Sequence, residues 1–279
     1  MNTILDISKA KVYFDGIFSE PRLAHPEGVA LDKNGTVYCG TENGDILKIK
    51  KDKSGLERLG TSKGFILGIA VDSAANIFAC EMKEASIYKY NKSDNTFKEF
   101  AKGPKIPNYP VIDEKRNALY VSDSFGFDEK GIGVYKFDLD TGLGAPCSSE
   151  LFNFANGMCL SPNGDYMYIV ESFHPCISRA PINDDGSLGK KEIFIENISN
   201  VPDGLAFDKN NNLFISCYEP SRIYMADQNG NCKILIEDAH ATVMAHPTNI
   251  AISEDGRTMY TSNLGRWHIT EIDITSLYT

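Results

Sequence analysis

The sequence predicts an all-β protein, a six-bladed β-propeller with four-stranded blades. A turn followed by an apolar strand recurs six times, and its aligned residues fall at positions 27, 67, 108, 156, 203 and 248. The steps between these positions run from 40 to 48 residues, a length that fits one four-stranded blade. The segments between turns alternate in polarity or are short runs rich in Val, Ile, Tyr and Phe, and both patterns are typical of strands.

Three further sets of segments follow the six opening motifs in register. The opening motifs themselves are His25–Asp32, Ile66–Asp72, Ile106–Asp113, Phe154–Ser161, Val201–Asp208 and His246–Ser253. Second strands are expected at Thr36–Cys39, Asn76–Ala79, Ala118–Val121, Tyr166–Val170, Asn212–Ile215 and Thr258–Thr261. Third strands are expected at Asp45–Ile49, Ser86–Tyr90, Gly133–Phe137 and Ser221–Tyr224, and fourth strands at Leu56–Leu59, Phe97–Phe100, Glu192–Ile195 and Lys233–Ile236.

The two ends of the chain are expected to share one blade. The sixth repeat ends at its third strand, Ile269–Ile274, and lacks a fourth. The segment Lys11–Phe14 precedes the first opening motif, where a fourth strand is due. An N-terminal strand would therefore close the last blade and leave no long sheet edge exposed. Since the repeat runs from end to end without a linker, we expect a single domain over residues 1–279.

The amino-acid composition limits the binding partners and the cellular compartment that we expect for this protein. The net charge of −10 disfavours nucleic acid, which needs a basic face. The longest apolar runs are too short to span a bilayer, and the first ten residues lack the pattern of a secretory signal. Seven cysteines without CxxC spacing indicate inert thiols in a reducing compartment. We therefore expect a cytoplasmic monomer or weak oligomer that acts on a small molecule, without a nucleic-acid or membrane partner.

Four oxygen-bearing side chains occupy the aligned position of different repeats: Glu27, Asn108, Asn156 and Asp203. The first strand of each blade lines the axis of a propeller, so these side chains would meet around one point. Two carboxylates and two amide oxygens suit one divalent cation, most of all Ca²⁺, with Mg²⁺, Mn²⁺ or Zn²⁺ as alternatives. A structural zinc site would instead use Cys and His. Taken singly, Asn-Gly and Asp-Gly are ordinary turn dipeptides.

Several motifs at these positions resemble the gluconolactonase and senescence-marker-protein (regucalcin-like) family of six-bladed propellers. They are Pro26–Gly28, Tyr120–Asp123, Ala155–Gly157, Asn156–Gly164, Pro202–Gly204, Pro247–Asn249 and Asn263–His268. The resemblance implies a lactone hydrolase in which Glu27, Asn156 and Asp203 bind the cation and Asp203 also serves as base or nucleophile. Asn108 matches a family ligand, but Tyr109-Pro110 replaces the Asp-Gly that often follows it.

The implied reaction is the opening of a sugar lactone or similar small cyclic ester by a metal-activated water. A cation polarises the carbonyl and lowers the pKa of water, and Asp203 can take the proton. Tyr109, His174 and Arg266 are candidate substrate contacts. His174 follows a second strand, and Arg266 could attract a sugar-acid carboxylate. His25 and His246 each precede Pro at one repeat point, so we expect them to share a strand-entry role.

Three other functions remain open on the sequence alone. An organophosphate (phosphotriester) hydrolase uses the same architecture with an axial Ca²⁺. A strictosidine-synthase-like condensing enzyme needs no metal and would keep its activity after chelation. A non-catalytic propeller that binds protein or peptide is also compatible with the fold, because propellers host many functions.

Overall fold

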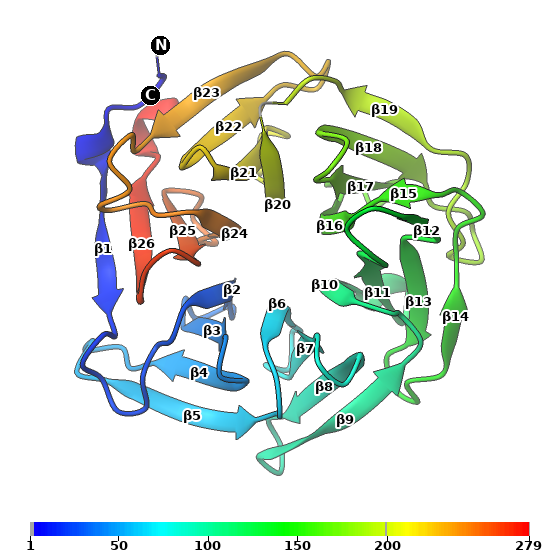
Figure 1. Cartoon of the computed structure of the whole chain (residues 1–279), viewed down its shortest axis with the longest axis horizontal. Helices are drawn as coiled ribbons and strands as arrows, with labels where there is room; N and C mark the ends of the chain where they lie inside the picture. The colour runs from blue at the N-terminus through cyan, green and yellow to red at the C-terminus, as the bar shows by residue number, and fades with distance from the viewer. Residues whose placement is uncertain (1–2, 199, 279) are drawn as a thin grey trace.

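The computed structural model describes residues 3–198 and 200–278 and contains six four-stranded antiparallel sheets. The sheets are arranged around a common axis, with β2, β6, β10, β16, β20 and β24 innermost (Figure 1). The predicted six-bladed propeller is therefore confirmed. Among the described residues, no helix is long and apolar enough to cross a membrane.

The blades follow one another in chain order. Blade 1 contains β2 (Pro26–Leu31), β3 (Val37–Thr41), β4 (Asp45–Ile49) and β5 (Leu56–Thr61), and blade 2 contains β6 (Ile66–Val71), β7 (Ile77–Glu81), β8 (Ser86–Asn91) and β9 (Thr96–Lys102). Blade 3 contains β10 (Pro107–Asp113), β11 (Ala118–Asp123), β13 (Val134–Asp138) and β14 (Gly144–Pro146), and blade 4 contains β16 (Ala155–Leu160), β17 (Tyr166–Glu171), β18 (Cys176–Pro181) and β19 (Glu192–Ile195). Blade 5 contains β20 (Val201–Phe207), β21 (Leu213–Glu219), β22 (Arg222–Ala226) and β23 (Cys232–Glu237), and blade 6 contains β24 (Pro247–Ile252), β25 (Thr258–Asn263), β26 (His268–Asp273) and β1 (Ala10–Asp15).

The N-terminal strand closes the ring as predicted. β1 pairs antiparallel with β26, with Ala10 opposite Ile272 and Asp15 opposite His268. Both ends of the chain consequently lie at blade 6 (Figure 1). This pairing covers the edge of β26 and links the first and last parts of the chain.

Apolar side chains fill the space between neighbouring blades. Ile46 of blade 1 and Ile69 of blade 2, for example, belong to one buried cluster, and Val111 of blade 3 and Met158 of blade 4 belong to another. Corresponding clusters join blades 2 and 3, 4 and 5, 5 and 6, and 6 and 1. Burial of apolar area between the sheets is the main term that holds the ring together. Cys39 and Cys80 belong to these clusters, and burial raises the pKa of both thiols, which makes them unreactive.

Blade 3 departs from the regular pattern at its outer edge. Its fourth strand, β14, is three residues long and all three are exposed, so it carries no alternation that sequence reasoning could detect. A further two-stranded pairing, β12 (Lys130–Gly131) with β15 (Phe152–Asn153), lies between blades 3 and 4. Three short 3₁₀ helices complete the described elements, at Ile7–Lys9, Glu114–Arg116 and Thr275–Leu277.

All six innermost strands are interrupted at the same point. The register with the second strand shifts between Pro26 and Gly28 in blade 1 and between Ala155 and Met158 in blade 4, and the other four blades show the same shift. Such a bulge leaves a residue outside the hydrogen-bonded ladder and re-aims its side chain. The aligned positions of the sequence repeat lie within these bulges.

Candidate metal centre

The four predicted ligands occupy the bulges of β2, β10, β16 and β20. Glu27, Asn108, Asn156 and Asp203 are all buried, with 4 to 6% of each residue exposed. Glu27 and Asp203 lie close enough for the charge of Asp203 to raise the pKa of Glu27, and Asn156 hydrogen-bonds to Asp203. The structure thus brings side chains from separate blades together near the axis.

Two serines fix the orientation of the asparagine amides. Asn108 donates from Nδ2 to Ser124 Oγ (3.0 Å), and Asn156 donates from Nδ2 to Ser172 Oγ (3.1 Å). Each serine in turn donates to a backbone carbonyl of the next blade, Ser124 to Ala155 (2.9 Å) and Ser172 to Pro202 (2.8 Å). Because the amide nitrogen is engaged, the Oδ1 atom of each asparagine is free to face another group.

Several buried oxygens of this region lack a hydrogen-bond partner. They are Asn108 Oδ1, Asn156 Oδ1, Asp203 Oδ1 and Asn249 Oδ1. Leaving a buried acceptor unsatisfied is costly, and native proteins show few such atoms. Unpartnered oxygens from four blades beside a buried Glu27 are the arrangement expected when a cation completes their coordination.

Burial also raises the pKa values of the two carboxyl groups. Desolvation raises the pKa of Asp203 to about 7, opposed by the Asn156 hydrogen bond. Desolvation raises the pKa of Glu27 well above its usual range, and the nearby charge of Asp203 raises it further. A cation between these carboxylates would offset both effects, because an opposite charge favours the ionised form.

The chemistry of the donor set matches a hard cation. Two carboxylates and the unpartnered amide oxygens are the donors that Ca²⁺ prefers, and Mg²⁺ or Mn²⁺ also bind such oxygens. Over residues 3–198 and 200–278, no three His, Cys, Asp or Glu side chains gather in a group that could hold a metal ion. The unpartnered amide oxygens of Asn108 and Asn156 are the further donors that a cation site here would use.

Glycines beside the candidate ligands allow the inner strands to approach closely. A Cβ atom on Gly157 would lie 2.2 Å from the carbonyl oxygen of Asp203, and one on Gly204 would lie 2.4 Å from that of Thr248. Both distances are shorter than any real contact, so only glycine fits. This packing between blades explains the glycine that follows Asn156 and the glycine that follows Asp203.

Asn249 is a site residue that the sequence analysis did not single out. It is fully buried, donates from Nδ2 to Glu27 Oε2 (3.3 Å) and leaves Oδ1 unpartnered. Its neighbour Thr248 occupies the aligned repeat position, but its hydroxyl donates to the backbone oxygen of Glu27 (2.7 Å). The sequence signal for Asn249 was its place in the Pro247–Asn249 motif, one position after the aligned residue Thr248.

The ends of the second strands hold the inner strands in place. Asp123 accepts hydrogen bonds from the backbone N–H groups of Lys105 (2.9 Å) and Ile106 (2.8 Å), and Glu171 accepts one from Asn153 (2.8 Å). These donors lie directly before the strands that carry Asn108 and Asn156. The carboxylates therefore position the entry to each inner strand, and this role, rather than metal ligation, accounts for the acidic residues at these strand ends.

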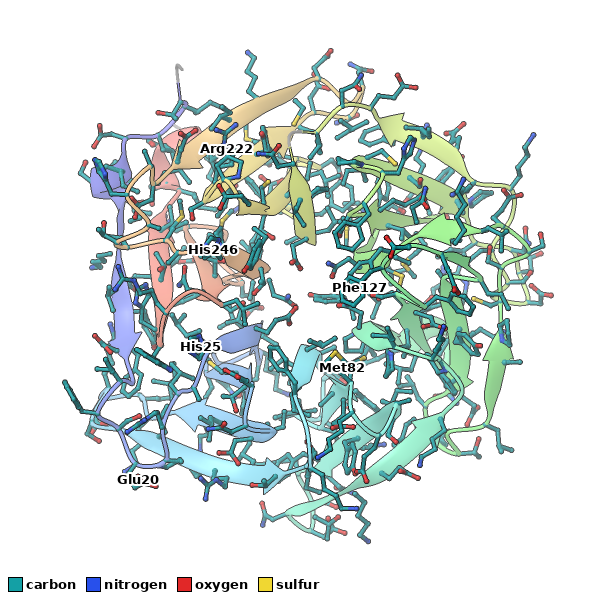
Figure 2. The ribbon with its side chains drawn as sticks, viewed as in Figure 1. Glu20, His25, Met82, Phe127, Arg222 and His246 are labelled. Atoms are coloured by element: carbon teal, nitrogen blue, oxygen red, sulfur yellow. The ribbon has the colours of Figure 1, made fainter. Side chains whose placement is uncertain are left out.

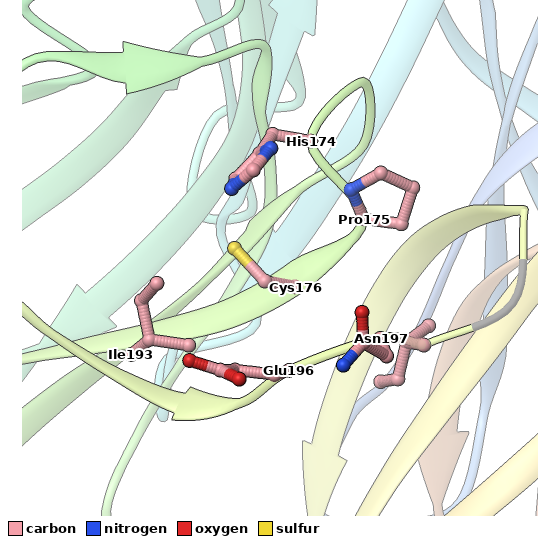
Figure 3. A pocket seen from close by; sticks show the side chains of 7 residues that line it. His174, Pro175, Cys176, Ile193, Glu196 and Asn197 are labelled. Atoms are coloured by element: carbon pink, nitrogen blue, oxygen red, sulfur yellow. The ribbon is translucent and has the colours of Figure 1, made fainter.

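The three candidate substrate contacts differ in their location and their exposure to solvent. Tyr109 is buried directly beside Asn108, and its backbone N–H donates to Ser122 Oγ (2.8 Å). Arg266 is exposed and donates to the backbone oxygen of Ala241. His174 is exposed in a separate surface pocket of about 540 Å³ (Figure 3). That pocket is lined by His174, Pro175, Cys176, Ile193, Glu196, Asn197 and Ile198.

His25 and His246 share one local conformation. Both have a positive φ, 40° and 53°, directly before β2 and β24. The Nδ1–H of His25 donates to the Leu264 carbonyl (2.7 Å), and that of His246 donates to the Tyr218 carbonyl (2.9 Å). Each ring thus fastens the start of its inner strand to the preceding blade, in agreement with the predicted strand-entry role.

The fold and this arrangement define a six-bladed propeller with a buried, oxygen-rich centre at its axis. Residues 128–265 match the model of the SMP-30/gluconolactonase/LRE-like region. The resemblance expected from the motifs is therefore confirmed, with this region as the matched part of the chain. Residues 18–49 match the N-terminal part of strictosidine-synthase-like proteins. None of the curated proteins compared with the chain matches it.

Solved structures with the same fold include proteins described as gluconolactonase and regucalcin. A gluconolactonase from Xanthomonas campestris superposes with a TM-score of 0.74 at 18% identity, over 89% of this chain and 85% of that one. A calcium-binding regucalcin from Agrobacterium tumefaciens strain C58 gives 0.75 at 16% identity, over 98% and 95%. A putative gluconolactonase gives 0.75 at 15% identity, over 95% and 91%. At such identities these likenesses establish the fold.

Proposed function

We propose that the protein is a divalent-cation-dependent hydrolase that opens a lactone or a similar small cyclic ester. The observation that carries the proposal is the set of buried, unpartnered oxygens of Asn108, Asn156 and Asp203 beside the buried Glu27. The family region at residues 128–265 supports lactone hydrolysis as the class of reaction. Ca²⁺ is the cation that these donors suit best.

Glu27, Asn108, Asn156 and Asp203 would hold the cation. When bound, it would polarise an ester carbonyl and stabilise the negative charge that develops on the carbonyl oxygen. Ser124 and Ser172 accept hydrogen bonds from the Nδ2 groups of the two asparagines. These bonds fix each amide with its oxygen on the side away from the serine, so the site is organised before a cation binds.

Asp203 is the proposed base. Its Oδ1 has no partner within the protein, and an ionised carboxylate there can take a proton from an attacking water. The water oxygen then bonds to the carbonyl carbon, the ring C–O bond breaks, and the ring oxygen leaves as a hydroxyl after gaining a proton. The product is the open hydroxy acid, and no other reactant is needed.

The direct test is hydrolysis of D-glucono-1,5-lactone followed by pH-stat, first after chelation and then with Ca²⁺, Mg²⁺, Mn²⁺ or Zn²⁺ restored. We expect turnover only with a cation and none in the Asp203→Asn variant. Wild-type rates from that variant would remove Asp203 from the mechanism. Calorimetry of cation binding distinguishes a wrong substrate, where binding persists without turnover, from a wrong site, where neither is seen.

A strictosidine-synthase-like reaction is the second candidate, because residues 18–49 match the N-terminal part of that group. Such a reaction does not require a metal. Undiminished activity in a condensation assay after exhaustive chelation would favour it over the lactonase proposal.

A further inference from the structure

Three phenylalanine rings form an exposed apolar surface close to the candidate metal centre. The ring of Phe154 lies 4.6 Å from that of Phe173 and 5.2 Å from that of Phe127, and the last two are 5.8 Å apart, centroid to centroid. Phe127 is 66% exposed and Phe173 is 47% exposed. We call this set of Phe127, Phe154 and Phe173 the aromatic wall. Phe154 is half-buried, and an exposed apolar cluster of this kind is a candidate surface for a ligand.

The aromatic wall is built on the residues that orient Asn156. Phe154 lies two residues before Asn156 in the chain, and Phe173 directly follows Ser172. Ser172 accepts the Asn156 amide through Oγ, and its backbone N–H donates to the Phe154 carbonyl (3.3 Å). The wall and the metal centre therefore belong to one local structure.

The opposite side of the axis carries two histidines. Figure 2 shows Phe127 across the axis from His25 and His246, with Met82 on the same half of the ring as Phe127. Met82 is itself 41% exposed. Both histidine rings are fixed by their Nδ1 hydrogen bonds. The ring of His25 packs on Trp267 (4.8 Å between centroids) and that of His246 on Tyr218 (4.5 Å), so this side combines histidine and aromatic rings, whereas the aromatic wall carries no polar side-chain atom of its own.

We propose that the substrate carries an alkyl or aryl substituent that packs on the aromatic wall, and that the enzyme prefers such lactones to polyhydroxylated sugar lactones. This inference rests on the proposed lactone hydrolysis. Packing an apolar group on the rings removes apolar surface from water, whereas a polyhydroxylated ring offers less apolar surface for this packing. A protein partner is a poor fit, because three rings provide far less than the roughly 800 Å² per partner of a stable interface.

Six-membered lactones that differ only in their substituent test the proposal. The substrates are δ-valerolactone, δ-decalactone with its five-carbon chain, and D-glucono-1,5-lactone, each assayed with the cation-loaded protein. We expect kcat/KM for δ-decalactone to exceed the other two by about tenfold or more. Phe127→Ala and Phe173→Ala should each lower that value about tenfold, mainly through KM, and leave δ-valerolactone nearly unchanged. Phe18→Ala is the matched control, because Phe18 is 93% exposed in the segment between β1 and β2.

Binding without turnover separates this inference from the proposed function. The lactams piperidin-2-one and 6-pentylpiperidin-2-one have the same ring without the ester bond, and calorimetry compares their affinities. Tighter binding of the pentyl lactam that is lost in Phe127→Ala supports the wall, even if no lactone is hydrolysed and the lactonase proposal falls. Equal affinities of the two lactams would overturn the inference while lactone hydrolysis stands. An equal loss of kcat/KM for δ-decalactone and δ-valerolactone in the Phe127→Ala variant would do the same.

Discussion

Replacing Asp203 by Asn is expected to stabilise the cation-free protein and to remove most of its response to Ca²⁺. Burial raises the pKa of this carboxyl from its usual 3.8 to about 7. At about 1.4 kcal/mol per pKa unit, holding Asp203 ionised in the fold at pH 8 costs up to roughly 4 kcal/mol. The amide has the same shape and no charge, so it avoids this cost and also loses a cation ligand.

The dependence on pH follows from the direction of the shift. The folded state holds the proton of Asp203 more tightly than the unfolded chain does, so this group favours folding below about pH 4. Its contribution is lost as the pH rises toward 7. Other carboxyl groups with lowered pKa values act in the opposite direction, but they are common to both proteins. The difference in stability between wild type and variant therefore reports on Asp203 together with the effect of its charge on the pKa of Glu27.

Urea denaturation at pH 5 and pH 8, with chelator and with Ca²⁺, measures this difference. With chelator, the variant should exceed the wild type in free energy of unfolding at pH 8, and by less at pH 5. Ca²⁺ at one hundred times its Kd should stabilise the wild type by about 2.7 kcal/mol and the variant by little. A chelated wild type as stable as the variant at pH 8, or equal responses to Ca²⁺, would refute the reasoning.

Two further substitutions examine how the ligands are oriented. Ser172→Ala should weaken Ca²⁺ binding by about tenfold, because the Asn156 amide loses the acceptor of its Nδ2 group. Ser62→Ala is the control, because it removes a buried hydroxyl that donates to backbone carbonyls away from the axis. It should leave the affinity for Ca²⁺ measured by calorimetry unchanged. An equal loss of affinity in Ser172→Ala and Ser62→Ala would contradict a role of Ser172 in orienting Asn156. Asn249→Ala should likewise raise the Kd for Ca²⁺, since Glu27 loses the donor to Oε2; an unaltered Kd would exclude Asn249 from the site.

Most of the fold could be predicted because the six structural repeats can be recognised in the sequence. Six equivalent openings of similar spacing, each followed by apolar strands, leave few architectures that bury them all. The missing fourth strand of the sixth repeat predicted the closure by β1. The three exposed residues of β14 could not be predicted, because they are held by backbone pairing to Val134–Asp138 and have no apolar pattern of their own.

The sequence by itself determined the ring and the residues that line its axis. Equivalent positions of a closed repeat must face the same point, and so Glu27, Asn108, Asn156 and Asp203 could be proposed together. Only the tertiary structure showed that Ser124 and Ser172 orient the amides of Asn108 and Asn156 by hydrogen bonds. It also showed that Asn249, one residue after the aligned position, contacts Glu27. The aromatic wall likewise depends on contacts of Phe127 in blade 3 with Phe154 and Phe173 in blade 4. The physical reason is that repeat spacing specifies which strand a residue occupies, whereas side-chain orientation depends on neighbours far away in the chain.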